Sequence, residues 1–101
     1  MTLYSENIMM EQPLIEIEYC TKCRWLARAS WMAQELLSTF SNEIGGITLI
    51  PSSISGIFEI RCGREIIWER GKKKGMPEIK ALKQKVRDVI APDKDLGHID
   101  S

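Results

Sequence analysis

In the segment Leu14-Ile15-Glu16-Ile17-Glu18-Tyr19-Cys20-Thr21-Lys22-Cys23 a strand-like alternation of side chains ends, and a helical pattern of apolar residues begins directly after it. Its opening residues alternate apolar and acidic side chains from the second position onward, and their β-branched and aromatic content is typical of a strand. Cys20 and Cys23 follow at once as a Cys-x-x-Cys pair. From residue 24 to about residue 40, apolar side chains recur three and four positions apart, which predicts a helix. We therefore expect the cysteine pair at a strand-to-helix junction.

Downstream of this junction the sequence predicts three more strands. A short apolar strand covers residues 47–50, and we expect it to end at Pro51, before a Ser-rich loop. Two further strands, at 57–61 and 65–69, flank Cys62-Gly63-Arg64, which is a hairpin signal.

The register of this hairpin follows from matching apolar residues across it. Pairing Arg61 with Glu65 sets Phe58 opposite Trp68 and places apolar residues together on that face. A two-residue turn at Cys62-Gly63 would instead set apolar against acidic side chains. We therefore predict a three-residue loop, Cys62-Gly63-Arg64.

A basic, glycine-containing loop follows at 69–75, and a second helix begins near Pro77, where the missing N–H of proline costs nothing. Pro92 stops this helix. Its apolar stripe consists of Ile79, Leu82, Val86, Val89 and Ile90.

The predicted order is β-α-β-β-β-α, an α/β (α+β) arrangement. The first half is a parallel βαβ unit with a right-handed crossover, and the second half adds a hairpin and a covering helix. A four-stranded mixed sheet with two helices is a minimal thioredoxin-like layout. We expect one domain at 13–92, with a flexible arm at 1–12 and a polar tail at 93–101.

Composition excludes several classes of function. The formal net charge is zero, because 14 Lys and Arg balance 14 Asp and Glu, so the basic excess of a nucleic-acid-binding domain is missing. No apolar run is long enough to predict a membrane span, and residues 1–12 do not resemble a signal or transit peptide. We therefore expect a cytoplasmic protein. Three cysteines are too few, and odd in number, for a disulfide-stapled secreted domain.

The spacing and placement of Cys20 and Cys23 favour redox chemistry. Unpaired N–H groups at a helix N-terminus stabilise a thiolate, and Lys22 and Arg24 add positive charge. With two intervening residues, one sulfur can resolve a mixed disulfide formed on the other. By analogy with thioredoxins, Cys20 would attack and Cys23 would resolve.

Several segments together resemble the Rdx family, which contains the selenoprotein W, T and H relatives and their cysteine-containing bacterial homologues. The resemblance runs from about residue 13 to residue 100. It is carried by Glu18-Tyr19-Cys20-Thr21-Lys22-Cys23, the helix Trp25 to Phe40, Ser55-Gly56-Ile57-Phe58-Glu59-Ile60, Gly75-Met76-Pro77-Glu78 and Leu96-Gly97-His98.

The resemblance implies a thioredoxin-like fold, a CxxC redox motif and a glutathione-linked or peroxide-protective role. Glutathione is thus the expected electron donor, or a protein thiol or disulfide the partner, with no bound cofactor. Selenocysteine in such relatives takes the position of Cys23, so the order of attack stays open. The loop 51–56 is less glycine-rich than in the family, and Met76 stands where Phe is common.

The other chemically distinctive residues have ordinary interpretations. We expect Cys62 to be an exposed thiol in the hairpin turn and His98 to be a solvated tail residue. The basic run Arg70-Gly71-Lys72-Lys73-Lys74 either attracts carboxylates or is a solvated loop. We expect Trp25, Trp31 and Trp68 to serve packing. Trp25 can also shape the surface around the sulfurs, and Trp31, which is off the main apolar stripe, can belong to an exposed docking patch.

Two alternative functions stay open at this stage. Cys20, Cys23, Cys62 and His98 supply the right donor types for zinc, and two thiolates alone suit a soft-metal carrier of Zn or Cu. Alternatively, a Cys20–Cys23 disulfide can switch an interaction domain that has no turnover.

Overall fold

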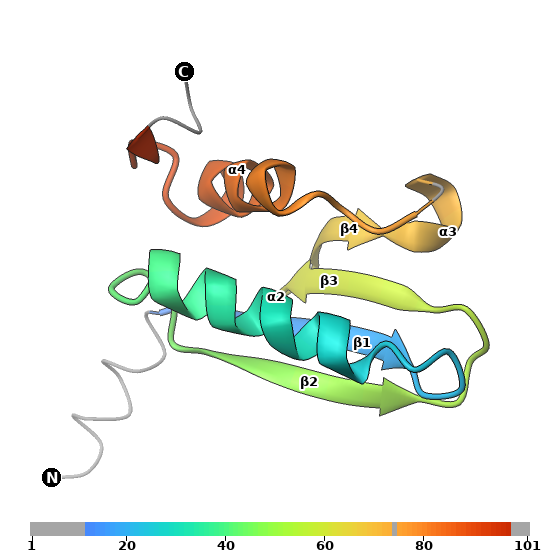
Figure 1. Ribbon diagram of the computed structural model, residues 1–101. Helices are drawn as coiled ribbons and strands as arrows, with labels where there is room; N and C mark the ends of the chain where they lie inside the picture. Colours follow the sequence, from blue (N-terminus) through green and yellow to red (C-terminus); the bar gives the residue numbers. More distant parts are fainter. Residues whose placement is uncertain (1–11, 74, 98–101) are drawn as a thin grey trace, which may run out of the picture.

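The computed structural model describes residues 12–73 and 75–97, and its helices and strands follow the predicted order (Figure 1). Most of the N-terminal arm and His98 lie outside the described residues. Within them, no helix is long and apolar enough to cross a membrane. The elements are β1 (Leu14–Cys20), α2 (Leu26–Thr39), β2 (Gly46–Ser52), β3 (Phe58–Cys62), β4 (Glu65–Glu69), α3 (Arg70–Lys73) and α4 (Ile79–Ile90).

The strands form a four-stranded mixed sheet in the order β2-β1-β3-β4. β1 pairs in parallel with β2 across the α2 crossover, and antiparallel with β3. β3 and β4 form the hairpin. The predicted mixed sheet with two principal helices is therefore confirmed, and β1 lies at its centre.

One face of the sheet carries the core. The alternation along β1 buries Ile15, Ile17 and Tyr19, while the glutamates between them face the other way. Both principal helices cover this apolar face, and they contact each other as well as the sheet (Figure 1). Their buried residues are Ala29, Met32, Ala33 and Leu36 of α2, and Leu82 and Val86 of α4. Val89, which we expected on the α4 stripe, is exposed.

Both principal helices begin later than the sequence predicted. Arg24 has a φ of 61°, a left-handed conformation that no helix interior allows, so α2 begins at Leu26. Residues 21–24 instead form a turn, in which the Arg24 amide donates to the Thr21 carbonyl at 3.3 Å. α4 begins at Ile79, so Pro77 lies just before the helix. Residues 70–73, predicted as loop, form the short helix α3.

β2 does not end at Pro51, as the sequence suggested, but continues to Ser52. Pro51 pairs with Tyr19, and Ser52 pairs with Cys20. Because β2 is an edge strand, the position without an N–H can face away from β1 without losing a ladder hydrogen bond. The longer strand brings the loop after Ser52 to the level of the cysteine pair.

The hairpin register differs from our prediction. Cys62 pairs with Glu65, which leaves Gly63-Arg64 as a two-residue turn. Gly63 has a φ of 62°, as the first central position of a type II′ turn requires. A bulge next to Ile60 then shifts the register, so that Ile67 and Trp68 both pack on the core. The bulge restores the apolar match that the shorter turn alone would lose.

The sheet face opposite the helices holds a cluster of four charged side chains. Arg61 of β3 lies between Glu16 and Glu18 of β1 and its own neighbour Glu59, at 3.0, 3.0 and 2.6 Å. The hydrogen bond to Glu59, followed by those to Glu18 and Glu16, raises the pKa of Arg61, so its charge is permanent. One cation thus neutralises part of a three-carboxylate patch.

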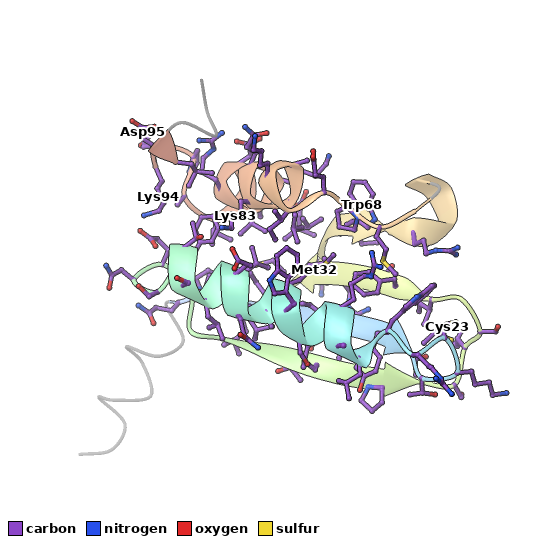
Figure 2. The ribbon with its side chains drawn as sticks, viewed as in Figure 1. Cys23, Met32, Trp68, Lys83, Lys94 and Asp95 are labelled. Atoms are coloured by element: carbon purple, nitrogen blue, oxygen red, sulfur yellow. The ribbon has the colours of Figure 1, made fainter. Side chains whose placement is uncertain are left out.

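Ion pairs also join α2 to α4 and the segment after α2 to the segment after α4. Lys83 of α4 contacts Glu35 of α2 at 2.9 Å, and Lys94 contacts Glu43 at 3.2 Å. Figure 2 shows the two lysines on the side of the molecule remote from Cys23. Leu96 packs against the core, so the beginning of the predicted polar tail is docked on the domain.

We expect Gly63→Ala to destabilise the protein by about 1 kcal/mol, because a Cβ disfavours the left-handed conformation even where space is free. Chemical denaturation measures the loss. Gly71→Ala is the matched control: its Cβ would also meet nothing within 4 Å, and Gly71 lies in a helix with no positive φ. Equal stability of the two variants would contradict the type II′ turn.

We expect Arg61→Met to cost about 2 kcal/mol of unfolding free energy, because three carboxylates lose the hydrogen-bonded cation between them. Denaturation at low and high salt checks the cause, since salt screens repulsion between carboxylates and should shrink the deficit. Arg64→Met is the control, because Arg64 is exposed in the hairpin turn. A salt-independent deficit would point to lost packing instead.

Candidate dithiol site

Cys20 and Cys23 lie together where β1 leads into α2, as the sequence predicted. Figure 2 shows Cys23 at this junction. Cys20 is the last residue of β1 and is 1% exposed. Cys23 lies in the following turn and is half-buried. Both are free thiols. A molecule approaching from solvent therefore meets the sulfur of Cys23 before that of Cys20.

The turn that carries the cysteines is held by the loop after β2. The Cys20 amide donates to the Ile57 carbonyl at 2.9 Å. The amide and the hydroxyl of Thr21 both donate to the Ser52 carbonyl, each at 3.2 Å. The buried Ser52 hydroxyl in turn accepts from the Ile54 amide at 3.2 Å. These bonds fix the loop 53–57 against the motif.

The two thiols share a hydrogen bond and have opposite pKa shifts. That bond from Cys23 is the main cause that lowers the pKa of Cys20, and burial opposes it. Backbone hydrogen bonds from Gly56, Cys23 and Lys22 lower the pKa of Cys20 further. The same bond raises the pKa of Cys23, as does burial, whereas Gly56 and the charge of Arg70 lower it. The pair thus favours a state with one thiolate and one thiol.

The source of this stabilisation differs from the one that the sequence suggested. Because α2 begins at Leu26, neither sulfur belongs to its first turn, and backbone groups of the turn and of Gly56 take the place of the helix N-terminus. Gly56 has a φ of 78°, which glycine adopts at little cost. It belongs to the segment 55–60 that carried the family resemblance, but its role depends on tertiary contact.

Trp25 and Arg70 complete the surroundings of the pair. The Trp25 ring packs edge-on against Phe58, with centroids 6.0 Å apart, so its expected packing role next to the motif is confirmed. The Arg70 guanidinium lies over the same ring, 4.9 Å from its centroid. Arg70 is far from the cysteines in sequence, where it is one member of the basic run 70–74. No sequence pattern indicated its contact with the motif.

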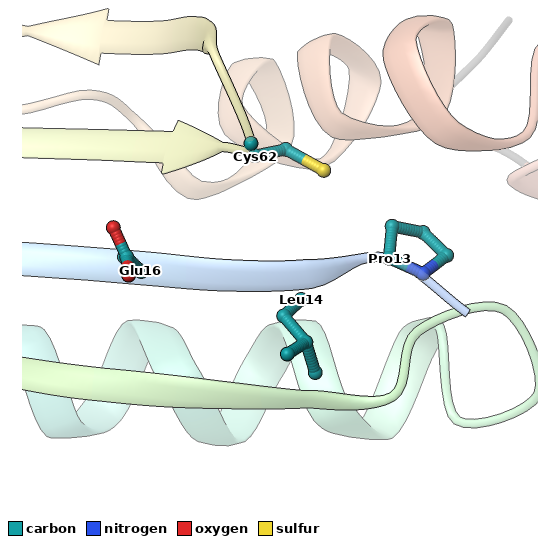
Figure 3. A pocket seen from close by; sticks show the side chains of 5 residues that line it. Pro13, Leu14, Glu16 and Cys62 are labelled. Carbon is teal, nitrogen blue, oxygen red and sulfur yellow. The ribbon is translucent and has the colours of Figure 1, made fainter. Parts of the chain in front are cut away.

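Cys62 lies at the opposite end of β1 from the pair. It is opposite Ile15 in the sheet, which puts it about 17 Å along the strand from Cys20. There it borders a hollow of ≈ 360 Å³ together with Pro13, Leu14, Glu16 and Gly63 (Figure 3). Cys62 is half-buried rather than exposed, and burial raises its pKa. It therefore cannot join Cys20 and Cys23 in one zinc site.

Comparison with known proteins places this geometry among redox-associated relatives. The model of the Rdx family matches residues 14–88. A protein from Bordetella parapertussis, whose crystal structure is known, is 51% identical in sequence to this chain. The two structures match with a TM-score of 0.73, and the match covers 76% of this chain and 96% of that one. A selenoprotein W-related protein from Vibrio cholerae is 50% identical, with a TM-score of 0.74, and coverages of 77% and 96%. No curated protein matches. The thioredoxin-like fold predicted from the sequence is thereby confirmed.

We expect Cys23→Ala to raise the pKa of Cys20, because it removes the hydrogen bond that lowers this pKa most. Cys20→Ala should lower the pKa of Cys23, since the bond and the nearby charge that raise it are lost. Thiolate absorbance against pH, in a Cys62→Ser background, measures both. An unmoved Cys20 titration in Cys23→Ala would show that the two sulfurs do not share a proton.

Proposed function

Because this chain belongs to the Rdx family, we propose that it is a thiol-disulfide oxidoreductase that cycles between a Cys20–Cys23 dithiol and the corresponding disulfide. The observation that carries the proposal is the placement of two free thiols three residues apart, Cys20 at the end of β1 and Cys23 in the turn that follows. The opposite pKa shifts of the two sulfurs support it. Thiol-disulfide exchange needs one thiolate to attack and a second thiol within reach to resolve the mixed disulfide. The pair supplies both within a single turn of the chain.

Cys23 is the attacking sulfur in this proposal. An incoming disulfide must reach the nucleophile in line with its S–S bond, and the 1% exposure of Cys20 leaves no room for that approach. This reverses the order that the analogy with thioredoxins suggested. It agrees with the position that the resemblance to selenocysteine-containing Rdx members implies for selenocysteine.

The lowered pKa of Cys20 is compatible with attack by Cys23. A coupled pair ionises as a unit, and its first macroscopic pKa belongs to neither sulfur alone. The Cys20 thiolate accepts a hydrogen bond from Cys23, so a proton shift along this bond generates the Cys23 thiolate at the accessible position. Cys20 thus acts first as the local acceptor of that proton and later as the resolving nucleophile.

The electron balance involves two thiols and one disulfide. The Cys23 thiolate attacks a substrate disulfide, its S–S bond breaks, and one substrate thiolate leaves. Cys20 then attacks the Cys23 sulfur, which forms the Cys20–Cys23 disulfide and releases the second substrate thiol. The protein loses two electrons and the substrate gains two. Glutathione or a protein thiol would restore the dithiol, which fits the reducing cytoplasm.

Mass spectrometry in glutathione redox buffers tests the proposal, with Cys62→Ser as background. From roughly −300 to −150 mV, the protein should lose two hydrogens as the Cys20–Cys23 disulfide forms. Cys20→Ser should accumulate a stable glutathione adduct on Cys23, because the resolving sulfur is missing. Cys23→Ser should accumulate much less adduct, since Cys20 is buried.

Three other outcomes would change the assignment. A protein that stays a dithiol across the whole range would refute the oxidoreductase, and zinc or copper binding by the two thiolates would then be measured by elemental analysis. Formation of the disulfide without acceleration of disulfide or peroxide reduction at catalytic protein concentration would favour a redox switch. Adduct on Cys23→Ser but not on Cys20→Ser would restore Cys20 as the attacking residue.

A further inference from the structure

Arg70 contacts both segments that surround the cysteine pair, although it belongs to neither. It is the first residue of α3, and its guanidinium lies over the ring of Trp25, the residue that precedes α2. Its Nη1 also donates to the Gly56 carbonyl, at a long 3.5 Å. Gly56 is the residue whose backbone hydrogen bonds lower the pKa of each sulfur. The guanidinium is therefore held at the rim of the dithiol site.

Arg70 makes no ion pair with any carboxylate of residues 12–73 and 75–97. The basic residues that do so there are Arg61, Lys83, Arg87 and Lys94. A guanidinium has five N–H donors in a planar fork, and stacking on an aromatic ring leaves the edges of that fork free. One donor of Arg70 reaches Gly56, and the others bond no residue in the described part of the chain, which leaves them available to a ligand.

Two chain segments next to the sulfurs contain no acidic residue. Segments 19–34 and 44–58, which build the site, contain no Asp or Glu, although the whole chain has equal numbers of acidic and basic residues. Lys22, Arg24 and Arg28 are exposed in the first of these segments. The local excess of positive charge favours an anionic partner at this end of the molecule.

We propose that Arg70 binds a carboxylate of the substrate, and that the site prefers disulfides that carry carboxylates. This inference rests on the proposed oxidoreductase function and names its substrate class. A carboxylate suits the free edge of the guanidinium, where two parallel hydrogen bonds can form. The charge of Arg70 also lowers the pKa of Cys23, against the larger effects of the Cys20 hydrogen bond and of burial, which raise it.

The reaction is the exchange already written, with the substrate anchored during it. Cys23 attacks the sulfur of the bound disulfide, the first thiolate leaves, and Cys20 displaces the second. No further oxidant is required, because the substrate disulfide accepts both electrons. In a single turnover the reduced protein supplies them, so no added reductant takes part.

Single-turnover oxidation of the reduced protein tests the role of Arg70, in a Cys62→Ser background at low salt. Three disulfides are compared: oxidised glutathione, which carries carboxylates, hydroxyethyl disulfide, which is neutral, and cystamine, which is cationic. The readout is the ratio of the rate constant for each charged disulfide to that for the neutral one. This ratio cancels any change in thiol ionisation, which affects all three substrates alike.

Arg70→Gln should lower the glutathione-to-neutral ratio about tenfold, the size expected for a lost charge-assisted hydrogen bond. Arg70→Lys should retain part of the preference, because it keeps the charge without the fork. Arg64→Gln removes an exposed positive charge in the hairpin turn and should leave the ratio unchanged. Melting temperatures verify that each variant is folded.

The outcomes separate this inference from the function on which it rests. If Arg70→Gln reacts with all three disulfides in the wild-type ratios, Arg70 is a structural link between α3 and Trp25, and the carboxylate role is wrong. If the wild-type protein is oxidised by none of the three, the oxidoreductase function itself has failed. An equal loss of ratio in Arg64→Gln would assign the preference to overall charge and overturn a specific site at Arg70.

Discussion

Hydrogen bonding on both sides of β1 is the constraint on which the rest of the site depends. β1 pairs with β2 on one side and β3 on the other, and a slip by one residue would turn its buried isoleucines to solvent. Its register is therefore fixed, and so is the position of Cys20 relative to the ends of the neighbouring strands. The bond from the Cys20 amide to the Ile57 carbonyl then brings the neighbouring loop against the sulfurs.

The same constraint explains why the pair is asymmetric. Cys20 still belongs to the strand and is covered by its neighbours, whereas Cys23 lies in the turn and is partly open to solvent. The left-handed conformation of Arg24 lets the chain turn once more before α2 begins. Strand, turn and loop thus give two identical side chains different exposure and different proton affinity, which is what an attacking and a resolving sulfur require.

Charge is segregated across the sheet and along it. Arg61 pairs with Glu16, Glu18 and Glu59 on the face that no helix covers, so one cation partly neutralises these three carboxylates. Arg70 is held at the other end of the same hairpin, against Trp25 and Gly56. A chain with no net charge therefore presents a locally positive surface where a thiolate has to form.

Local patterns were enough for the main elements. The alternation along 15–19 and the helical spacing after residue 24 both derive from which side chains are apolar, and burial of apolar surface dominates folding. They fixed the order of strands and helices and the position of the cysteine pair. Where backbone conformation mattered more than side-chain polarity, the sequence prediction was wrong, as at Arg24, at Pro51 and in the two-residue turn beginning at Gly63.

The sequence by itself determined that Cys20 and Cys23 lie next to each other at a strand end, because both belong to one short covalent segment. It also identified the family through motifs that are contiguous in the chain. Only the tertiary structure decided that Gly56 and Arg70 join them, that Cys62 does not, and that Cys23 is the more accessible sulfur. These relations involve residues brought together by the pairing of β1 with β2 and β3, and such long-range contacts leave no periodic signal in the sequence.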